Sequence, residues 1–308
     1  MWLPFVIAGS VILFLLLLLL SALYVMYKLT FYSPQKGQND DFKMAGPQYE
    51  GFEKEVIELV SNMVSIPYED AFITSFDKLK LHAYVYPHPG SKKVAIMCHG
   101  YRGTPKRDFS GAGAQMIELG INLILIDERA HGQSQGHSIT FGRKEKYDVL
   151  SWIDYAKKRF GDDIEIILMG ISMGGATVLY LADKVENAKI IADCPFIKQS
   201  DLLKNSMKMM KLNPKIMFPL LNLSSIIFGH ANMNKDNAFE TVKNNKNNKI
   251  MIIHGDNDFL VPHEMTLALY EANKDKIQYE LFPKANHGMS FLYDTPRYKK
   301  IVEDFINK

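Results

Sequence analysis

The sequence predicts an α/β fold with a mainly parallel central sheet and helices on both of its faces. Short, nearly uninterrupted apolar runs alternate with helical patterns along most of the chain, as expected of strands buried on both faces. One such run, 164–169, leads into Gly170-Ile171-Ser172-Met173-Gly174-Gly175, and a helical pattern follows at 176–185. A serine at a sharp strand-to-helix turn needs small residues two positions before and after it, since larger side chains would collide there.

The expected elements begin with a helix and a hairpin. Residues 49–64 carry apolar side chains at helical spacing, which predicts an amphipathic helix packed on the core. Two strand-like runs, 71–76 and 79–86, meet at Asp77-Lys78 and predict a hairpin. In the alternating part that follows, we expect strands at 94–98, 122–126, 164–169, 189–193, 250–253 and 277–282, and helices near 108–119, 144–160 and 176–185.

The N-terminus carries a segment of a different kind. Residues 1–27 contain no lysine, arginine, aspartate or glutamate, and 13–20 is nearly pure leucine. About 20 apolar residues span the hydrocarbon core of a bilayer, so this segment is long enough to cross it. A cleaved signal peptide is the alternative. It is disfavoured because the run exceeds the usual apolar region of about 7–15 residues and no basic residue precedes it.

These observations predict three parts: an N-terminal transmembrane anchor at 1–30, a linker at 31–48 rich in polar and turn-forming residues, and a folded domain at 49–308. Lys28 and two further lysines follow the apolar segment and none precedes it. The positive-inside tendency then predicts a single-pass protein of the cell membrane with its domain in the cytoplasm.

Composition narrows the function classes. A chain of 308 residues that is 47% hydrophobic can bury one large core without a second domain. The net charge of +2 gives no reason to expect a nucleic-acid partner. Cys98 and Cys194 each end an apolar run, where small buried thiols are common. Neither a disulfide framework nor a metal-ligand spacing is visible, so we expect no metal and no cofactor.

Ionisable side chains follow two later strands in an order that suits nucleophilic catalysis. The run at 250–253 is followed by Asp256 and Asp258, and the run at 277–282 by His287. In such an arrangement the histidine takes the proton of Ser172, and the acid holds the imidazole in the correct tautomer. Both aspartates lie just after the same strand, so position by itself leaves the acid open.

Five motifs in this order resemble the α/β-hydrolase superfamily, in particular its serine esterase, lipase and S33-type peptidase branches. The resemblance covers roughly Ile66 to Lys308. The motifs are His99-Gly100, Asp127-Glu128-Arg129-Ala130-His131-Gly132-Gln133-Ser134, Gly170 to Gly175, His254 to Pro262, and Asn286-His287-Gly288.

The resemblance implies roles for individual residues. Ser172 is the expected nucleophile and His287 the expected base. Asp258 matches the position of the acid, and Asp256 then becomes a turn residue. The backbone N–H groups of Met173 and Tyr101 are the expected oxyanion hole. Structural roles are expected for His99, Arg129, His131 and His254.

The alternation of strands and helices breaks between Pro195 and Lys249. This stretch lies between the sixth and seventh expected strands, where the superfamily often inserts a helical cap, and it is rich in methionine, leucine and phenylalanine. Methionine suits a surface that adapts to varied apolar ligands, so we expect a cap at about 196–249 that covers the acyl side of the site. Ordinary core helices are the alternative. Asp193, just before it, is expected either to line the pocket or to form a hinge of the cap.

The leading function is a membrane-anchored serine hydrolase that cleaves carboxylic esters of apolar or amphiphilic acyl substrates. Its expected partners are a small-molecule or lipid-like ester and the membrane. An S33-type aminopeptidase is the alternative, since it uses the same acyl chemistry. A cap with many lysines and few acids mildly disfavours it, because such enzymes recognise a free amino terminus. A hydrolase-fold binding module without catalysis is the third candidate.

Overall fold

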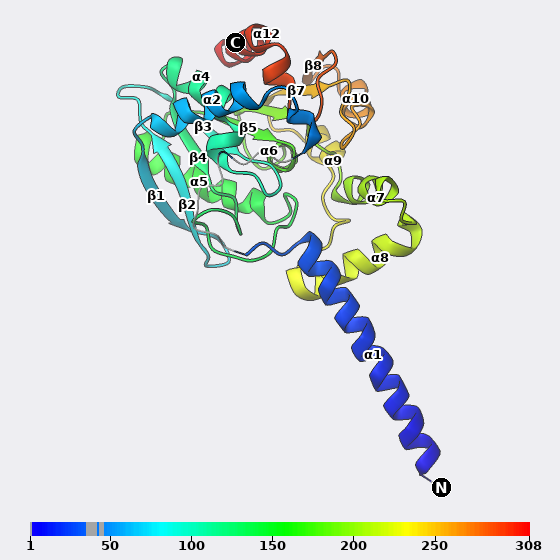
Figure 1. Cartoon of the computed structure of the whole chain (residues 1–308). Helices are drawn as coiled ribbons and strands as arrows, with labels where there is room; N and C mark the ends of the chain where they lie inside the picture. The colour runs from blue at the N-terminus through cyan, green and yellow to red at the C-terminus, as the bar shows by residue number, and fades with distance from the viewer. Residues whose placement is uncertain (1, 35–41, 43–45) are drawn as a thin grey trace.

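One sheet of eight strands forms the centre of the computed structural model, which describes residues 2–34, 42 and 46–308 (Figure 1). The strands are β1 (Glu69–Thr74), β2 (Lys80–Tyr86), β3 (Lys93–Cys98), β4 (Asn122–Ile126), β5 (Glu165–Ile171), β6 (Lys189–Asp193), β7 (Lys249–Gly255) and β8 (Ile277–Phe282). Their order in the sheet is β1-β2-β4-β3-β5-β6-β7-β8. β2 pairs antiparallel with both β1 and β4, and every pair from β4 to β8 is parallel. This mainly parallel sheet confirms the predicted fold class.

Helices fill the connections between the strands. Before the cap they are α1 (Leu3–Thr30), η1 (Pro47–Tyr49), α2 (Glu53–Ser65), α3 (Pro105–Asp108), α4 (Ser110–Glu118), α5 (Glu145–Phe160) and α6 (Met173–Leu179). The later helices are α7 (Gln199–Met209), α8 (Pro214–Ser224), η2 (Ser225–Gly229), α9 (Ala238–Lys243), α10 (Glu264–Glu271), α11 (Ser290–Tyr293) and α12 (Thr295–Asn307).

Two apolar layers cover the two faces of the sheet. One contains Trp152 of α5 together with side chains of α6, α9 and α10. The other contains Met63 of α2, Met116 of α4 and Val302 of α12. Strand residues alternate between the layers, as Val85 in the first and Tyr84 in the second illustrate. Because both faces are covered, the central strands are apolar along their whole length.

The helix after Ser172 differs from its predicted bounds. We expected 176–185, whereas α6 begins at Met173 and ends at Leu179. It begins earlier because the backbone N–H of Ala176 donates to the carbonyl oxygen of Ser172 at 2.9 Å, which closes the first turn at the serine itself. The start of α6 therefore lies directly behind the serine.

Helix α1 projects away from the sheet and is the one candidate membrane span among the described residues (Figure 1). Its residues 3–22 are exposed along their whole length. The end of the helix behaves differently, because Leu23, Tyr27 and the following Phe31 are buried against the domain. Phe31 meets Phe141 edge to face, with ring centroids 5.9 Å apart. Residues 35–41 and 43–45 of the predicted linker lie outside the described residues.

The predicted cap is a helical insertion between β6 and β7, made of α7, α8, η2 and α9. Its helices α8 and η2 pack beside the end of α1. The aromatic ring of Phe228 in η2 lies 5.2 Å from that of Tyr24 and 5.6 Å from that of Tyr27. The cap therefore packs against the end of the N-terminal helix.

Candidate active site

Ser172 occupies the strained turn that its sequence context predicts. Its backbone lies at φ 54° and ψ −110°, a left-handed conformation that side chains rarely adopt. Glycines on both sides make the turn possible. A Cβ on Gly170 would overlap the carbonyl oxygen of Gly174, and one on Gly174 would overlap the carbonyl oxygen of Cys98. The turn lifts the serine hydroxyl above the carboxyl end of β5, at the start of α6.

The structure brings Ser172, His287 and Asp258 into one hydrogen-bonded line. The Nε2 atom of His287 lies 2.8 Å from Oγ of Ser172, and its Nδ1 atom lies 2.7 Å from Oδ2 of Asp258. With Nδ1 donating to the carboxylate, Nε2 is left as an acceptor for the serine proton. The three residues come from the ends of β5, β8 and β7, so one edge of the sheet holds them all.

The surroundings of Asp258 keep it ionised. Its Oδ1 accepts hydrogen bonds from the backbone N–H groups of Leu260 and Val261 at 2.9 and 2.8 Å. Burial by itself would raise the pKa of Asp258, but the hydrogen bonds to His254 and His287 outweigh it and lower the pKa below its ordinary value. A carboxylate that stays charged can stabilise an imidazolium on His287.

Asp256 lies in the same turn but has a different environment. It is exposed, and its Oδ1 accepts a hydrogen bond from the backbone N–H of Lys284. This bond ties the turn after β7 to the loop after β8. The geometry matches the turn role that the resemblance implies for Asp256.

The loop after β3 lies beside the serine. A Cβ on Gly100 would lie 3.7 Å from the Cβ of Ser172, so the loop backbone approaches Ser172 closely. The N–H groups of Gly100 and Arg102 donate to Asp108 and His131 respectively. In the part of the chain that the structure describes, the N–H of Tyr101 between them has no acceptor. It is free to bind an oxyanion.

Two buried histidines hold this loop. Nδ1 of His99 lies 2.8 Å from the carbonyl oxygen of Gly100, and its Nε2 accepts from the N–H of Glu128 at 3.1 Å. Nε2 of His131 accepts from the N–H of Arg102 at 3.1 Å. Burial lowers the pKa of His99, and burial together with the nearby His99 lowers the pKa of His131 to about 3. Both rings are neutral, as these acceptor roles require.

A cavity of about 370 Å³ opens beside Ser172 and His287. Its walls are mainly apolar, and they come from η1, α2, the start of α4, α11 and the start of α12. The apolar contributors include Val56, Leu59, Phe109, Ile171, Phe291 and Leu292. Charged side chains also line it, among them Arg102, Arg107 and Asp108. A mainly apolar cleft of this size that also holds charged groups suits a small amphiphilic ligand.

The prediction that the cap covers the acyl side of the site is wrong for this cavity. None of the described residues that line it belongs to 196–249. Met209 and Met210 are exposed, and Phe218 is buried in the core beside the first face of the sheet. The cap packs toward α1, and it is α2 that lies beside Ser172 and lines the cavity. Helical spacing predicted that Val56 and Leu59 face the core. It could not predict that they line the cavity beside Ser172.

Asp193, at the end of β6, lines the cavity and is 3% exposed. Its Oδ2 accepts a hydrogen bond from the hydroxyl of Tyr298 at 2.9 Å. Burial raises the pKa of Asp193 to about 7, and the nearby charge of Asp258 adds to the rise, against the opposing effects of Tyr298 and His287. Of the two roles open for Asp193, the structure shows the pocket-lining one.

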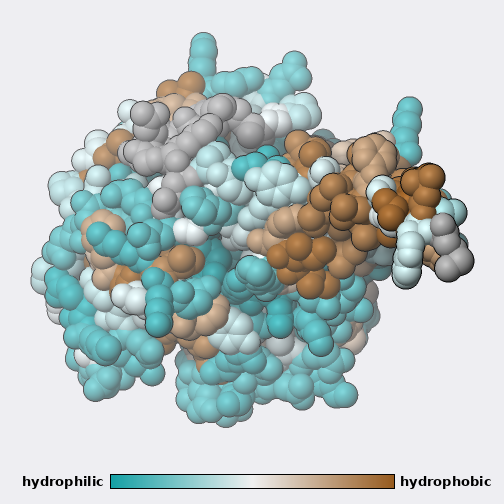
Figure 2. Space-filling model, turned by 90° about the horizontal axis from the view of Figure 1, so that it is seen from below, coloured by the Kyte–Doolittle hydropathy of each residue, from teal (hydrophilic) through white to brown (hydrophobic). Residues whose placement is uncertain are grey.

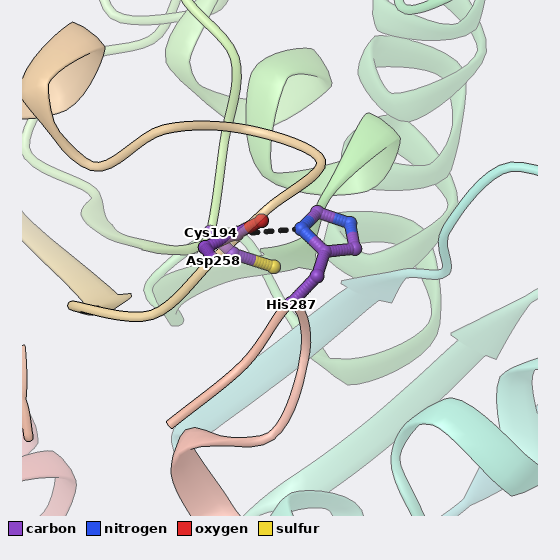
Figure 3. A group of neighbouring side chains, drawn as sticks. All are labelled: Cys194, Asp258 and His287. Carbon is purple, nitrogen blue, oxygen red and sulfur yellow. Dashed lines mark hydrogen bonds and ion pairs between the residues drawn. The ribbon is translucent and has the colours of Figure 1, made fainter. Parts of the chain in front are cut away.

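Cys194 lies next to Asp258 and His287, and sequence reasoning gave it only a buried structural role. Its sulfur, a carboxylate oxygen of Asp258 and a ring nitrogen of His287 lie within 4.8 Å of one another (Figure 3). This donor set suits a metal poorly. The ring and the carboxylate already bond to each other, and burial raises the pKa of the thiol well above its ordinary value. The cluster fits a triad with a packed thiol behind it.

The fold and the nucleophile turn define an α/β-hydrolase. The family model described as "Serine aminopeptidase, S33" matches residues 89–249, and the chain belongs to that family. The uncharacterized protein YqkD of Bacillus subtilis is 25% identical over 230 residues, which are 73% of this chain and 74% of that protein.

The chain is also similar to a second curated protein and to a solved structure. An uncharacterized membrane protein of Saccharomyces cerevisiae, YNL320W, is 26% identical over 251 residues, 78% of this chain and 80% of that protein. Among solved structures, the Pyrococcus furiosus esterase Pf2001 superposes with a TM-score of 0.67 at 24% identity, covering 90% of this chain and 97% of that one. The likeness to Pf2001 shows the fold.

Proposed function

We propose that this protein is a serine hydrolase that cleaves carboxylic esters of apolar or amphiphilic acyl substrates, with α1 holding it in a membrane. The observation that carries the proposal is the hydrogen-bonded line of Ser172, His287 and Asp258 at the wall of an apolar cavity. That arrangement is suited to acyl transfer through a covalent acyl-enzyme.

The reaction follows from the geometry. Oγ of Ser172 attacks the ester carbonyl carbon while Nε2 of His287 takes the hydroxyl proton. The negative charge that develops on the carbonyl oxygen is stabilised by the backbone N–H groups of Tyr101 and Met173. The intermediate collapses, the C–O bond to the alcohol breaks, and His287 returns the proton to the leaving oxygen. Water, activated by His287, then releases the acid and regenerates Ser172.

The anchor rests on the dimensions of α1. Residues 3–22 are exposed, and at about 1.5 Å per residue they measure about 30 Å, the thickness of a bilayer hydrocarbon core. The curated relative from yeast is named a membrane protein. With Lys28 after the span, the positive-inside tendency orients the domain to the cytoplasm. A signal peptidase product beginning near Ala22 would contradict an uncleaved anchor.

Labelling with a fluorophosphonate tests the chemistry. The wild-type protein should form a covalent adduct at Ser172, and Ser172→Ala should form none while its thermal unfolding remains similar. Hydrolysis of p-nitrophenyl esters of increasing acyl length should then show a preference for longer chains until the cavity is full. Labelling that persists in Ser172→Ala would exclude this serine as the nucleophile.

An aminopeptidase is the second candidate, because Asp193 places a carboxyl group in the cavity and the family model carries that description. A carboxylate there can bind the ammonium group of an aminoacyl substrate. Aminoacyl anilides and acyl esters of matched size separate the two candidates. Faster turnover of the anilides would favour the peptidase.

A further inference from the structure

The helical segment formed by α8 and η2 is apolar on two opposite sides. On the inner side, Phe218 and Leu221 are buried in the core. On the outer side, four large aliphatic residues are between 39% and 62% exposed: Ile216, Leu223, Ile226 and Ile227. A surface helix of a globular domain normally turns a polar face to water, so a continuous apolar outer face indicates something that covers it.

This outer face lies where α1 leaves the domain. The ring of Phe228 in η2 contacts Tyr24, only two residues after Ala22, where the run of consecutively exposed residues in α1 ends. If the exposed part of α1 fills the hydrocarbon core, the bilayer boundary lies at the level of η2. Figure 1 shows α8 and η2 on the side of the domain from which α1 projects, with α8 crossing near its upper end. Seen from below, the apolar surface of this face gathers on the side where α1 projects toward the viewer (Figure 2).

The turn between α7 and α8 adds positive charge to the apolar face. Lys208, Met209, Met210, Lys211 and Leu212 are all exposed in succession. Residues 202–235 contain no aspartate or glutamate, and their lysines are Lys204, Lys208, Lys211, Lys215 and Lys235. Lysines beside exposed aliphatic side chains are typical of helices that lie in a membrane interface, where the ammonium groups meet anionic headgroups.

We propose that the α7–α8 turn, α8 and η2 form a second membrane contact, in which the aliphatic side chains enter the interface and the lysines bind anionic phospholipid headgroups. The occupant of this face is the surface of the bilayer that α1 enters, so the inference rests on the proposed anchor. At 16 residues, Pro214–Gly229 is too short to span a bilayer and suits a position along its surface.

The second contact would fix how the domain sits on the membrane. A single helix leaves a domain free to tilt and rotate, whereas two contacts restrict both. The cap leaves the sheet at its carboxyl edge, which is also the edge that carries Ser172. A fixed tilt would in turn fix the direction in which the cavity at this edge faces relative to the lipid surface.

Fluorescent probes on single introduced cysteines test the proposal in the full chain. Cys98 and Cys194 are fully buried, so a thiol-reactive dye reports the introduced site. Ile216→Cys and Ile226→Cys place the dye on the outer face. Ile57→Cys is the matched control, because Ile57 is 46% exposed on α2, on the side of the domain away from α1. Leu13→Cys reports the insertion of α1 itself.

Each variant is reconstituted into vesicles of phosphatidylcholine and phosphatidylglycerol that contain nitroxide-labelled lipid. Dyes at the two cap positions should be quenched several-fold more than the dye on α2 when the nitroxide lies near the headgroups. The dye on α1 should respond most to a nitroxide deep in the acyl chains. If the cap dyes are quenched no more than the α2 control while the α1 dye is quenched, the second contact is overturned and the anchor stands. An unquenched α1 dye would overturn the anchor and the inference together.

The lysines are tested by charge removal. The triple substitution Lys208→Gln, Lys211→Gln and Lys215→Gln should reduce the quenching of the dye at position 226 in vesicles with anionic lipid. It should have little effect in pure phosphatidylcholine. Lys157→Gln with Lys158→Gln, on exposed positions of α5, is the control and should change neither. Equal quenching in the triple variant and the unsubstituted protein would overturn the headgroup assignment.

Discussion

The hydroxyl of Tyr101 donates a hydrogen bond to the carbonyl oxygen of Thr30 at 2.8 Å. The side chain of the next residue, Arg102, donates to the carbonyl oxygens of Leu29 and Tyr32. Carbonyl groups at the end of a helix lack hydrogen-bond partners within the helix. Here the loop after β3, beside Ser172, supplies those partners. The end of the proposed anchor and the proposed oxyanion hole are thus parts of one hydrogen-bonded unit.

Removing the hydroxyl should disturb this unit without removing the backbone donor. Tyr101→Phe should lower kcat by no more than about tenfold, because a single neutral hydrogen bond contributes about 0.5–1.5 kcal/mol. KM for a short ester should change little, since Tyr101 lines the cavity and the substitution keeps its ring and removes only the hydroxyl. Steady-state kinetics on p-nitrophenyl acetate measure both, with Tyr147→Phe on the exposed side of α5 as the control. A larger rise in KM than fall in kcat would argue against a positioning role.

Truncation should show that the end of α1 belongs to the domain. A chain that begins at Phe42 lacks Tyr27 and Phe31, whose buried rings lie in the core. Loss of a buried aromatic side chain costs about 3–5 kcal/mol. We expect this chain to unfold at a clearly lower temperature than one that begins at Leu23, with both released from the membrane. Equal melting temperatures would mean that these rings contribute little.

The two aspartates after β7 should differ in their effects. Asp258→Asn should lower turnover by about 10⁴, because the imidazole would be held in the wrong tautomer. Asp256→Asn should stay within a few-fold of the wild type, since the Asp256 side chain is exposed and accepts a hydrogen bond from the backbone of Lys284 in the loop after β8. Kinetics with one ester substrate, alongside thermal unfolding of both variants, separate chemistry from folding. Comparable losses in the two variants would remove the distinction.

Asp193 should make stability depend on pH. Its pKa is raised to about 7 in the folded protein, whereas an unfolded aspartate titrates near 3.9. Folding thus favours the protonated form of Asp193. The contribution of this carboxyl to the free energy of unfolding is therefore fully present below about pH 4 and is lost as the pH rises through about 7. Asp193→Asn should weaken the fall in melting temperature between about pH 5 and pH 8. Asp154→Asn, at an exposed position, should leave the profile unchanged.

The acyl preference should respond to the cavity wall and not to the cap. Each methylene buried in the cavity is worth about 0.8 kcal/mol, which is about fourfold in kcat/KM. Leu59→Trp should narrow the cavity, abolish this gain for long acyl chains and leave acetyl esters nearly unaffected. Met210→Trp, on the exposed tip of the cap, should retain the wild-type series of p-nitrophenyl esters. The reverse pattern would restore the cap as the acyl-binding element.

By itself the sequence determined the fold class, and it predicted the sharp turn at Ser172 and the polar residues Asp258 and His287 after two later strands. These follow from local chemistry, namely apolar strands, small residues around Ser172 and polar residues just after two strands. The apolar segment at 1–27 could also be recognised from the sequence, because about 20 consecutive apolar residues are long enough to span a bilayer.

The tertiary structure decided which segments surround Ser172. The cap and α2 both carry apolar faces, and periodicity cannot tell which of them meets Ser172. Packing placed α2 at the cavity and turned the cap toward α1, so that Met209 and Met210 face outward. The bond between Tyr101 and Thr30 joins residues 71 positions apart, a distance over which no local pattern operates. Such contacts depend on how the whole chain closes around the sheet, which is why only the structure decided them.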